Sequence, residues 1–301
     1  MIAEQIRYRR ATSQDTRACH DLMWSSVVEL GARIGSPLDG TADEWWSSGE
    51  PLHRLLAKLA AEWWVAEEMD SGRLVGFARA LERDGLFELT EFFVLPDAQG
   101  KGVGRRLLEL AFPAGRGLVR SIVATSDVRA QARYYAADTV ARFPVYTLSA
   151  RPSVAELAAD LETVPINGAQ TIEEQRAIER EVLGHRRSDE EMRWLLERRR
   201  GHLYTRDGQA VGFSFVGRDG VGPAAAREAS DLPSILLHVE TLAHAMGLDR
   251  IEIQAPAPNE VAIRHLMRRG FRFDPWINIL MADHPFGHFE RFVPFSPPMF
   301  L

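Results

Sequence analysis

The same order of strand and helix patterns occurs twice along this 301-residue chain, and that repetition limits what it can fold into. Alternating apolar residues predict strands, apolar residues at helical spacing predict helices, and Gly, Pro and Asp mark the turns between them. In the first half, strands are predicted at 6–10, 63–68, 74–81, 86–94, 118–124 and 145–149, and helices at 12–34, at 51–61, from about 103 to Pro113, and at 128–141. Between two of these strands, Asp84-Gly85 is typical of a tight hairpin.

The second half repeats this order, as an ancient duplication would. Strands are predicted at 163–166, 220–225, 250–254 and 276–281, with a hairpin over 203–216 that turns on Asp207-Gly208, and helices within 171–200 and at 231–246 and 260–269. At roughly 150 residues per domain, the length also favours two domains. We therefore predict domains at 1–150 and 151–301, with residues from about 151 to 160 as a linker.

The composition excludes several classes of protein. Hydrophobic residues make up 46% and charged residues 26%, which is typical of a folded soluble chain rather than a disordered or fibrous one. The net charge of -6 argues against a nucleic-acid-binding protein. Cys19 is the single cysteine, so no intrachain disulfide forms, and the sequence has neither an apolar export signal nor an 18-residue apolar run. We expect a cytoplasmic protein that contacts no membrane.

A glycine-rich segment, residues 99–105 (Gln-Gly-Lys-Gly-Val-Gly-Arg), lies between a predicted strand and a predicted helix. Its backbone N–H groups can converge on an anion at the helix N-terminus, and a diphosphate is a natural ligand there. The segment is not a nucleotide P-loop because no Lys-Ser/Thr pair follows it, and not a dinucleotide fingerprint because Leu107 replaces the third glycine. The alternative is a tight turn that needs glycine for its backbone angles.

Residues 93–108, which contain this loop, resemble motif A of the GNAT superfamily of N-acetyltransferases. That motif reads Gln/Arg-x-x-Gly-x-Gly/Ala, and Gln99, Gly102 and Gly104 occupy its positions after a Val-x-Pro strand end. The resemblance extends over the first 150 residues in the order of strands and helices. It implies an α/β (α+β) fold of two tandem GNAT-type domains, each a mixed, mostly antiparallel twisted sheet flanked by helices.

The resemblance also implies acetyl-CoA as co-substrate. Its pyrophosphate would lie on the glycine-rich loop, and the strand before the loop would hold pantetheine and the acetyl carbonyl through backbone groups. The residues implied in this binding are Phe93, Val94, Leu95, Gln99, Gly100, Lys101, Gly102, Val103, Gly104 and Arg105, together with Asp127.

A second family pattern, Asn-x-x-Ala-x-x-Leu-Tyr-x-x-x-Gly-Phe, is similar to residues 127–134. Tyr134 occupies the position of the family's tyrosine, which protonates the departing CoA thiolate, a role compatible with a phenol pKa of about 10. Asp127 replaces the usual Asn, and no Gly-Phe follows at the expected spacing. The alternative is a tyrosine that only packs in the core or on the surface, and Tyr135 is the second candidate.

Acetyl transfer to an amine also requires removal of a proton, because alkylamines are protonated at pH 7. Glu88 is the first candidate base, since the histone acetyltransferase branch of the family carries a glutamate six residues before the motif's valine, here Val94. Glu91 is the second candidate. The alternative for Glu88 is a solvated carboxylate on a strand. The backbone N–H near Val94 would face the carbonyl oxygen that gains negative charge.

Two other kinds of chemistry are not favoured. Cys19 precedes His20 within a predicted helix, where neighbouring side chains diverge, so direct transfer is favoured over an acetyl-cysteine intermediate. His53, His185 and His202 lack the spacing of metal ligands, so we predict no metal.

Residues 24–53 correspond to the variable region that shapes the acceptor pocket in the family. This region contains aromatic and acidic residues that could receive a cationic amine, namely Asp39, Asp43, Glu44, Trp45 and Trp46. The alternative is that its tryptophans belong to the core.

The second half keeps the pattern from Asn259 to Gly270-Phe271, but Leu266 occupies the tyrosine position and residues 221–233 contain no glycine-rich loop. We therefore expect a degenerate GNAT copy that packs against the first domain and helps to wall the acceptor site.

Together these features predict an acetyl-CoA-dependent N-acetyltransferase that moves an acetyl group directly to a primary amine. The acceptor is an unidentified small molecule or peptide, and the protein is a monomer or homodimer. The alternative is an acyl-CoA-binding regulatory or scaffold protein without catalysis, since the tyrosine pattern is imperfect. The sequence specifies neither the acceptor nor the length of the acyl chain.

Overall fold

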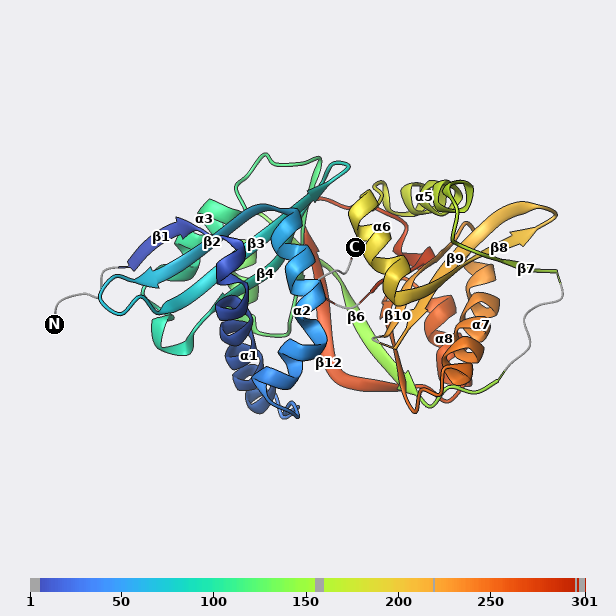
Figure 1. Cartoon of the computed structure of the whole chain (residues 1–301), viewed down its shortest axis with the longest axis horizontal. Coiled ribbons are helices and arrows are strands. Elements are labelled where there is room, and N and C mark those ends of the chain that lie inside the picture. The colour runs from blue at the N-terminus through green and yellow to red at the C-terminus, as the bar shows by residue number, and fades with distance from the viewer. Residues whose placement is uncertain (1–5, 155–159, 219, 296, 298–300) are drawn as a thin grey trace. The chain divides into compact units, whose positions relative to one another are not determined.

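The computed structural model describes residues 6–154, 160–218, 220–295, 297 and 301 (Figure 1). Contacts within the chain define two units. Unit 1 is Met1–Val140 with Met281–His284, and unit 2 is Ala141–Leu280 with Pro285–Leu301. Residues 155–159 of the predicted linker lie outside the described residues. Among the helices of the described chain, none is both long enough and apolar enough to cross a bilayer.

Unit 1 contains a five-stranded array in the order β1-β2-β3-β4-β5. The first four strands pair antiparallel, and β5 pairs parallel with β4. Its elements are β1 (Ile6–Arg10), η1 (Ser13–Asp15), α1 (Thr16–Arg33), α2 (Ala42–Leu59), β2 (Ala60–Glu68), β3 (Leu74–Arg83), β4 (Leu86–Val94), η2 (Pro96–Ala98), α3 (Val103–Ala111), β5 (Val119–Ala124) and α4 (Val128–Tyr135).

The predicted hairpin between β3 and β4 is confirmed. Arg83 pairs with Leu86, and the two residues between them, Asp84 and Gly85, have φ angles of 47° and 93°. Positive φ at both central positions is the signature of a type I′ turn, whose twist matches that of the flanking strands.

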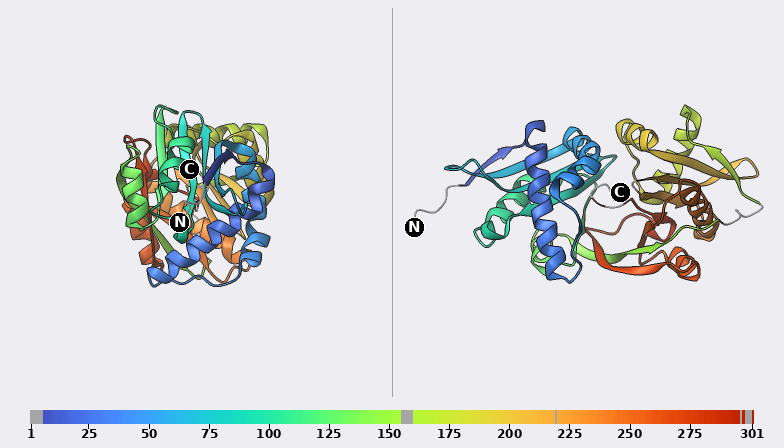
Figure 2. Two further views of the ribbon diagram at one scale, coloured as in Figure 1. Left: turned by 90° about the vertical axis from the view of Figure 1, so that its left-hand side faces the viewer. Right: turned by 60° about the horizontal axis from the view of Figure 1, so that its bottom comes forward.

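Helices cover both faces of the unit 1 sheet. On one face, Cys19 and Leu22 of α1 pack on Trp63, Val65 and Phe77 of the sheet, and α2 lies beside α1 (Figure 2, right). On the other face, α3 approaches β3 closely at Gly76. A Cβ atom there would lie 3.0 Å from Leu107 Cδ1, so glycine allows this close packing.

Two helices of unit 1 differ in length from their prediction. The helix expected at 51–61 begins at Ala42, because Thr41 and Glu44 form a capping box. Thr41 N–H donates to Glu44 Oε2 at 2.8 Å, and the helix continues through Pro51. The helix expected at 128–141 ends at Tyr135, because Thr139 N–H and Oγ1 both donate to the Tyr134 carbonyl, at 3.1 and 2.9 Å.

Unit 2 contains a five-stranded sheet in the order β13-β10-β9-β8-β7 and a second group in which β6 lies between β12 and β11. Its elements are β6 (Val140–Ala150), β7 (Glu162–Pro165), α5 (Ala169–Leu183), α6 (Asp189–Arg198), β8 (Arg199–Arg206), β9 (Gln209–Gly217), β10 (Gly220–Ala226), η3 (Ala229–Asp231), α7 (Leu232–Ala245), β11 (Ile251–Pro256), α8 (Glu260–Arg268), β12 (Arg272–Ala282), η4 (Phe289–Arg291) and β13 (Phe292–Val293).

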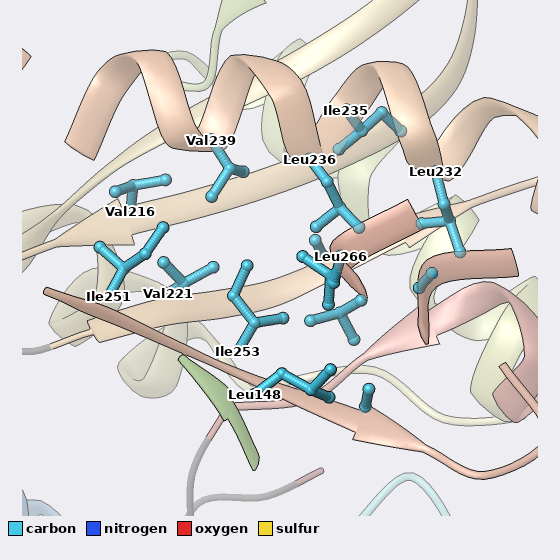
Figure 3. Packing of buried hydrophobic residues seen from close by; sticks show 14 of the residues in the cluster. Leu148, Val216, Val221, Leu232, Ile235, Leu236, Val239, Ile251, Ile253 and Leu266 are labelled. Atoms are coloured by element: carbon cyan, nitrogen blue, oxygen red, sulfur yellow. The ribbon is translucent and has the colours of Figure 1, made fainter. Parts of the chain in front are cut away.

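The core of unit 2 forms where α7 faces its strands (Figure 3). Apolar side chains of α7 lie at helical spacing and are fully buried, and they face side chains of β9, β10, β11 and β6. The residues concerned are Leu232, Ile235, Leu236 and Val239 of α7, and Val216, Val221, Ile251, Ile253 and Leu148 of the strands.

The division into units does not fall at residue 150. β6 pairs antiparallel with β11, from Val145↔Pro256 to Ala150↔Ile251, so nearly all of it groups with unit 2. In return, the short segment Met281–His284 belongs to unit 1. There Arg120 N–H donates to Asp283 Oδ1, and Asp283 N–H donates to the Arg120 carbonyl, both at 3.1 Å.

Candidate active site

Strands β4 and β5 separate part of the way along unit 1. Their parallel register runs from Leu86↔Val119 to Leu89↔Ile122, whereas β4 continues to Val94. The separation begins at a β-bulge, because Arg79 of β3 pairs with Glu91 and Ala80 pairs with Leu89, which leaves Thr90 as the extra residue. Within the described chain, no β5 residue pairs with β4 beyond Leu89. Peptide groups on that side of β4 can therefore bind a ligand.

The glycine-rich loop follows β4 and opens α3, as predicted. Gly100 and Gly102 have φ angles of 78° and 86°, and Gly102 is the N-cap of α3. A Cβ atom at either position would meet no atom within 4 Å outside the neighbouring residues, so the loop borders open space. Lys101 and Arg105 are exposed beside it, whereas Val103 is buried under the first turn. The positive φ angles explain why these turn positions are occupied by glycine. The absence of side chains there also leaves the loop accessible to a ligand.

Gln99 ties the loop to its surroundings. Its Nε2 donates to the Val94 carbonyl at 2.9 Å, and its Oε1 accepts from Arg129 Nη1 at 3.0 Å. The same arginine forms an ion pair with Asp127 at 3.0 Å. The end of β4, the loop and the start of α4 are thus joined through two side chains.

Asp127 caps α4 through its carboxylate. Its Oδ1 accepts from Arg129 N–H at 3.0 Å, and its Oδ2 lies 2.9 Å from Arg33 Nη2. Burial opposes ionisation, but the hydrogen bonds and charge of Arg129 outweigh it and hold the Asp127 pKa below its usual range. The carboxylate predicted to bind the co-substrate is therefore already engaged by two arginines.

Tyr134 of α4 lies on the face of β4 to which Phe92 points. Its side chain is buried and meets the ring of Phe92 edge to face at a centroid distance of 5.9 Å. Burial raises the pKa of the Tyr134 phenol above its usual value, so the hydroxyl stays protonated at neutral pH. The second candidate, Tyr135, is half exposed.

Glu88 and Glu91 are both buried, so the alternative of a solvated strand carboxylate at Glu88 is wrong. Glu88 Oε2 lies 3.0 Å from Arg83 Nη1, and Glu91 Oε2 lies 2.8 Å from Arg79 Nη1. The two glutamates are three residues apart yet share one face of the sheet, because the bulge at Thr90 shifts the alternation by one residue. This is the face that α1 and α2 cover.

Two histidines from these helices accompany Glu91. His53 Nδ1 of α2 lies 3.7 Å from Glu91 Oε1, and the His20 ring of α1 contacts the His53 ring edge to face at 5.0 Å. Trp46 stacks parallel to His53 at a centroid distance of 6.1 Å. We call His20, Trp46, His53, Arg79 and Glu91 the His53 cluster. The sequence did not predict His20, Arg79 and His53 as site residues. They lie on three separate elements, and no regular spacing in the sequence relates them.

Burial lowers the pKa of His53, and the charge of Glu91 only partly opposes this. The neighbouring His20 and Arg79 lower it further. His53 is therefore a neutral imidazole at pH 7, which can accept a proton.

Two of the three acidic side chains predicted for the acceptor pocket, Asp43 and Glu44, are engaged elsewhere. Asp43 pairs with Arg17, and Glu44 caps its own helix at Thr41. The Asp39 backbone carbonyl accepts from Trp45 Nε1 at 3.0 Å. Trp46 is thus the member of the predicted acceptor set that reaches the His53 cluster.

Covalent catalysis by Cys19 does not fit its environment. The side chain is 1% exposed, and burial raises the pKa of the thiol to about 12. Within the described residues, no group of three or more His, Cys, Asp or Glu side chains is arranged to hold a metal ion.

Among the described residues of unit 2, the cap of α4 has a counterpart, whereas Tyr134 and the loop before α3 have none. Asn259 caps α8 as Asp127 caps α4, with Oδ1 accepting from Ala262 N–H at 3.1 Å. However, Leu266 is buried at the tyrosine position. β10 leads through the short η3 into α7, where the Pro233 nitrogen carries no hydrogen to donate to an anion.

Comparison with known proteins agrees with this geometry. Residues 60–137, from β2 to α4, match the family model described as "Acetyltransferase (GNAT) domain". Among curated proteins, no sequence matches this chain.

Solved structures resemble the chain over most of its length. A protein of Pyrococcus horikoshii, provisionally described as an acetyltransferase, is 16% identical with a TM-score of 0.73, over 100% of this chain and 97% of that one. A GCN5-related N-acetyltransferase of Sphaerobacter thermophilus is 16% identical with a TM-score of 0.63, over 94% and 96%. A tandem GNAT protein from the clavulanic acid biosynthesis pathway is 15% identical with a TM-score of 0.58, over 93% and 99%.

At these identities the structural likeness shows the fold. The expected fold class is confirmed. Residues 60–137 match the model of the GNAT acetyltransferase domain, and the chain as a whole has a fold similar to that of a tandem GNAT protein.

Proposed function

We propose that this protein is an acetyl-CoA-dependent N-acetyltransferase that transfers an acetyl group directly to a primary amine. The observation that carries the proposal is the path of β4, which leaves β5 after Leu89 and leads into a glycine-rich loop at the N-terminus of α3. The family match over residues 60–137 covers this whole path.

The loop fits a diphosphate. Amide groups from Gly100 to Gly104 precede or open α3, and the positive end of the helix dipole favours an anion there. Open space at Gly100 and Gly102 leaves room for it, and the exposed Lys101 and Arg105 add positive charge. Backbone groups of Phe93, Val94 and Leu95 would hold the pantetheine arm.

The chemistry uses groups on both faces of β4. Tyr134 would give its proton to the departing thiolate, and the backbone N–H near Val94 would donate to the acetyl oxygen as negative charge develops. On the other face, Glu91 is the carboxylate that lies with a neutral imidazole, whereas Glu88 pairs with Arg83. Glu91 is therefore the better placed of the two predicted glutamates.

The second candidate is an acyl-CoA-binding regulatory or scaffold protein without catalysis. Two observations favour it: Asp127 replaces the family's Asn, and both candidate bases are held in buried ion pairs.

Two measurements separate these functions. Calorimetry with acetyl-CoA should detect binding at one site per chain, since residues 221–233, which precede and open α7 in unit 2, contain no glycine-rich loop. At 100 times Kd, the ligand should stabilise the native state by about 2.7 kcal/mol. Release of free CoA in the presence of a panel of primary amines then supports the enzyme, whereas tight binding without release supports the binding protein. Absence of any binding would exclude both.

A further inference from the structure

The His53 cluster contains a neutral imidazole that the predicted mechanism does not use. We propose that His53 is the catalytic residue that removes the proton from the acceptor's alkylammonium group, and that Glu91 is a positioning residue that holds its ring. The proposal deepens the proposed function and rests on it.

The two nitrogens of His53 face different surroundings. Nδ1 lies 3.7 Å from Glu91 Oε1, an ion-pair distance longer than a hydrogen bond, so this nitrogen is the one that faces the carboxylate. The other edge of the ring lies next to Gly49, one turn earlier in α2. A Cβ atom at Gly49 would stand 3.4 Å from His53 Nε2 and Cδ2. Glycine therefore places no side chain of its own against this edge, and 10% of the His53 side chain is exposed.

Charged and titratable groups approach His53 from three other elements. Glu91 comes from β4, Arg79 from β3 and His20 from α1. Arg79 neutralises much of the Glu91 charge from 2.8 Å, so Glu91 orients the ring without keeping it protonated. His20 Nδ1 lies 3.1 Å from Asp21 Oδ1, while its buried Nε2 has no hydrogen-bond partner among the described atoms.

The first step is a proton transfer from the alkylammonium group to His53. An N–H bond of the alkylammonium breaks, its electron pair stays on nitrogen, and an Nε2–H bond forms on His53, which becomes an imidazolium. The free pair then forms the C–N bond while the C–S bond of the thioester breaks. The thiolate takes the Tyr134 proton, the new amide nitrogen returns one proton to the tyrosine, and His53 releases its proton to solvent.

The test is the pH dependence of His53→Gln, measured with an amine found active in the panel. Wild type acts on the ammonium form, so its kcat/KM should be flat from pH 7 to 9. The variant acts only on amine that is already deprotonated in solution. Its kcat/KM should therefore rise about tenfold per pH unit toward the amine pKa. At pH 7 the variant should be about 10²-fold slower. His288→Gln, on an exposed histidine outside the cluster, should match wild type at every pH.

Gly49→Ala is a second variant, and it keeps the His53 imidazole in place. Alanine favours helix more than glycine, so the melting temperature should stay equal or rise. The added methyl group covers the His53 edge, so kcat/KM for the amine should fall about tenfold. Acetyl-CoA affinity should not change in either variant.

The outcomes separate the two proposals. A wild type that binds acetyl-CoA but releases no CoA with any amine overturns the proposed function, and the role of His53 with it. An active wild type whose ratio to His53→Gln does not change with pH overturns the role of His53 alone. The same holds if Gly49→Ala keeps full activity.

Discussion

Glu91 and Phe92 are consecutive residues of β4 that face opposite sides of the unit 1 sheet. Glu91 lies with Arg79 and His53 under α1 and α2, whereas Phe92 contacts Tyr134 of α4. A thioester held along the free edge of β4 would therefore have a proton acceptor on one face and a proton donor on the other. A single strand keeps the two groups apart, so they do not neutralise each other.

Tyr134→Phe should lower kcat at least about tenfold, because the departing thiolate loses its proton donor. Acetyl-CoA affinity should stay the same, since the phenol hydroxyl is not part of the loop. Steady-state kinetics and calorimetry check both statements. Tyr135→Phe, on the exposed neighbour, is the matched control. Equal kcat in wild type and Tyr134→Phe would remove the tyrosine from the mechanism.

Gly102→Ala should weaken acetyl-CoA binding about tenfold or more, because the N-cap of α3 must keep a left-handed conformation with its amides exposed. Gly115→Ala is a matched control, since Gly115 also has positive φ, at 75°, and open space around it. Both variants carry similar backbone strain, and only Gly102→Ala alters the loop. Calorimetry that finds the same Kd for both would show that the loop does not bind the ligand.

Glu88→Gln should act on stability more than on catalysis. The substitution removes one charge of a buried ion pair with Arg83, and such changes cost about 3–5 kcal/mol. Urea unfolding measures this loss, and turnover per folded molecule should change less than about threefold. A stable variant whose turnover falls more than tenfold would instead identify Glu88 as the base, as first predicted.

Asp127 should contribute stability that depends on pH. Its folded-state pKa is lowered, so the contribution is complete above the unfolded value of about 3.9 and is lost as pH falls through the folded value. Asp127→Asn keeps a capping oxygen but removes the charge. The difference in free energy of unfolding from wild type should be about 0.5–1 kcal/mol at pH 7 and should shrink below pH 4. A difference that persists at low pH would mean that the charge is not its source.

Cys19→Ala should keep the full acetyl-transfer rate. A buried thiol with a pKa of about 12 holds almost no thiolate at pH 7, so it cannot carry the acetyl group. The wild-type thiol should also resist alkylation until the protein is unfolded. Trapping of an acetylated Cys19 by mass spectrometry would contradict direct transfer.

Much of the fold could be predicted because its signals are local. The Asp84-Gly85 turn and the loop before α3 each depend on backbone angles that glycine adopts easily, and these appear directly in the sequence. The start of α2 was predicted wrongly, because proline is typical of the first helical position and Pro51 was therefore expected to begin the helix, whereas the Thr41 capping box begins it at Ala42. The residues of one loop also indicated the family whose model matches residues 60–137.

The sequence by itself determined the succession of elements, the glycine-rich loop and the two candidate glutamates, because spacing and residue type encode them locally. Only the tertiary structure decided that β6 pairs with β11, that Glu88 and Glu91 share a face, and that His53 reaches Glu91. The first two depend on strand register and on one extra residue at Thr90. The third depends on helix packing, which brings together side chains 38 positions apart that no local pattern relates.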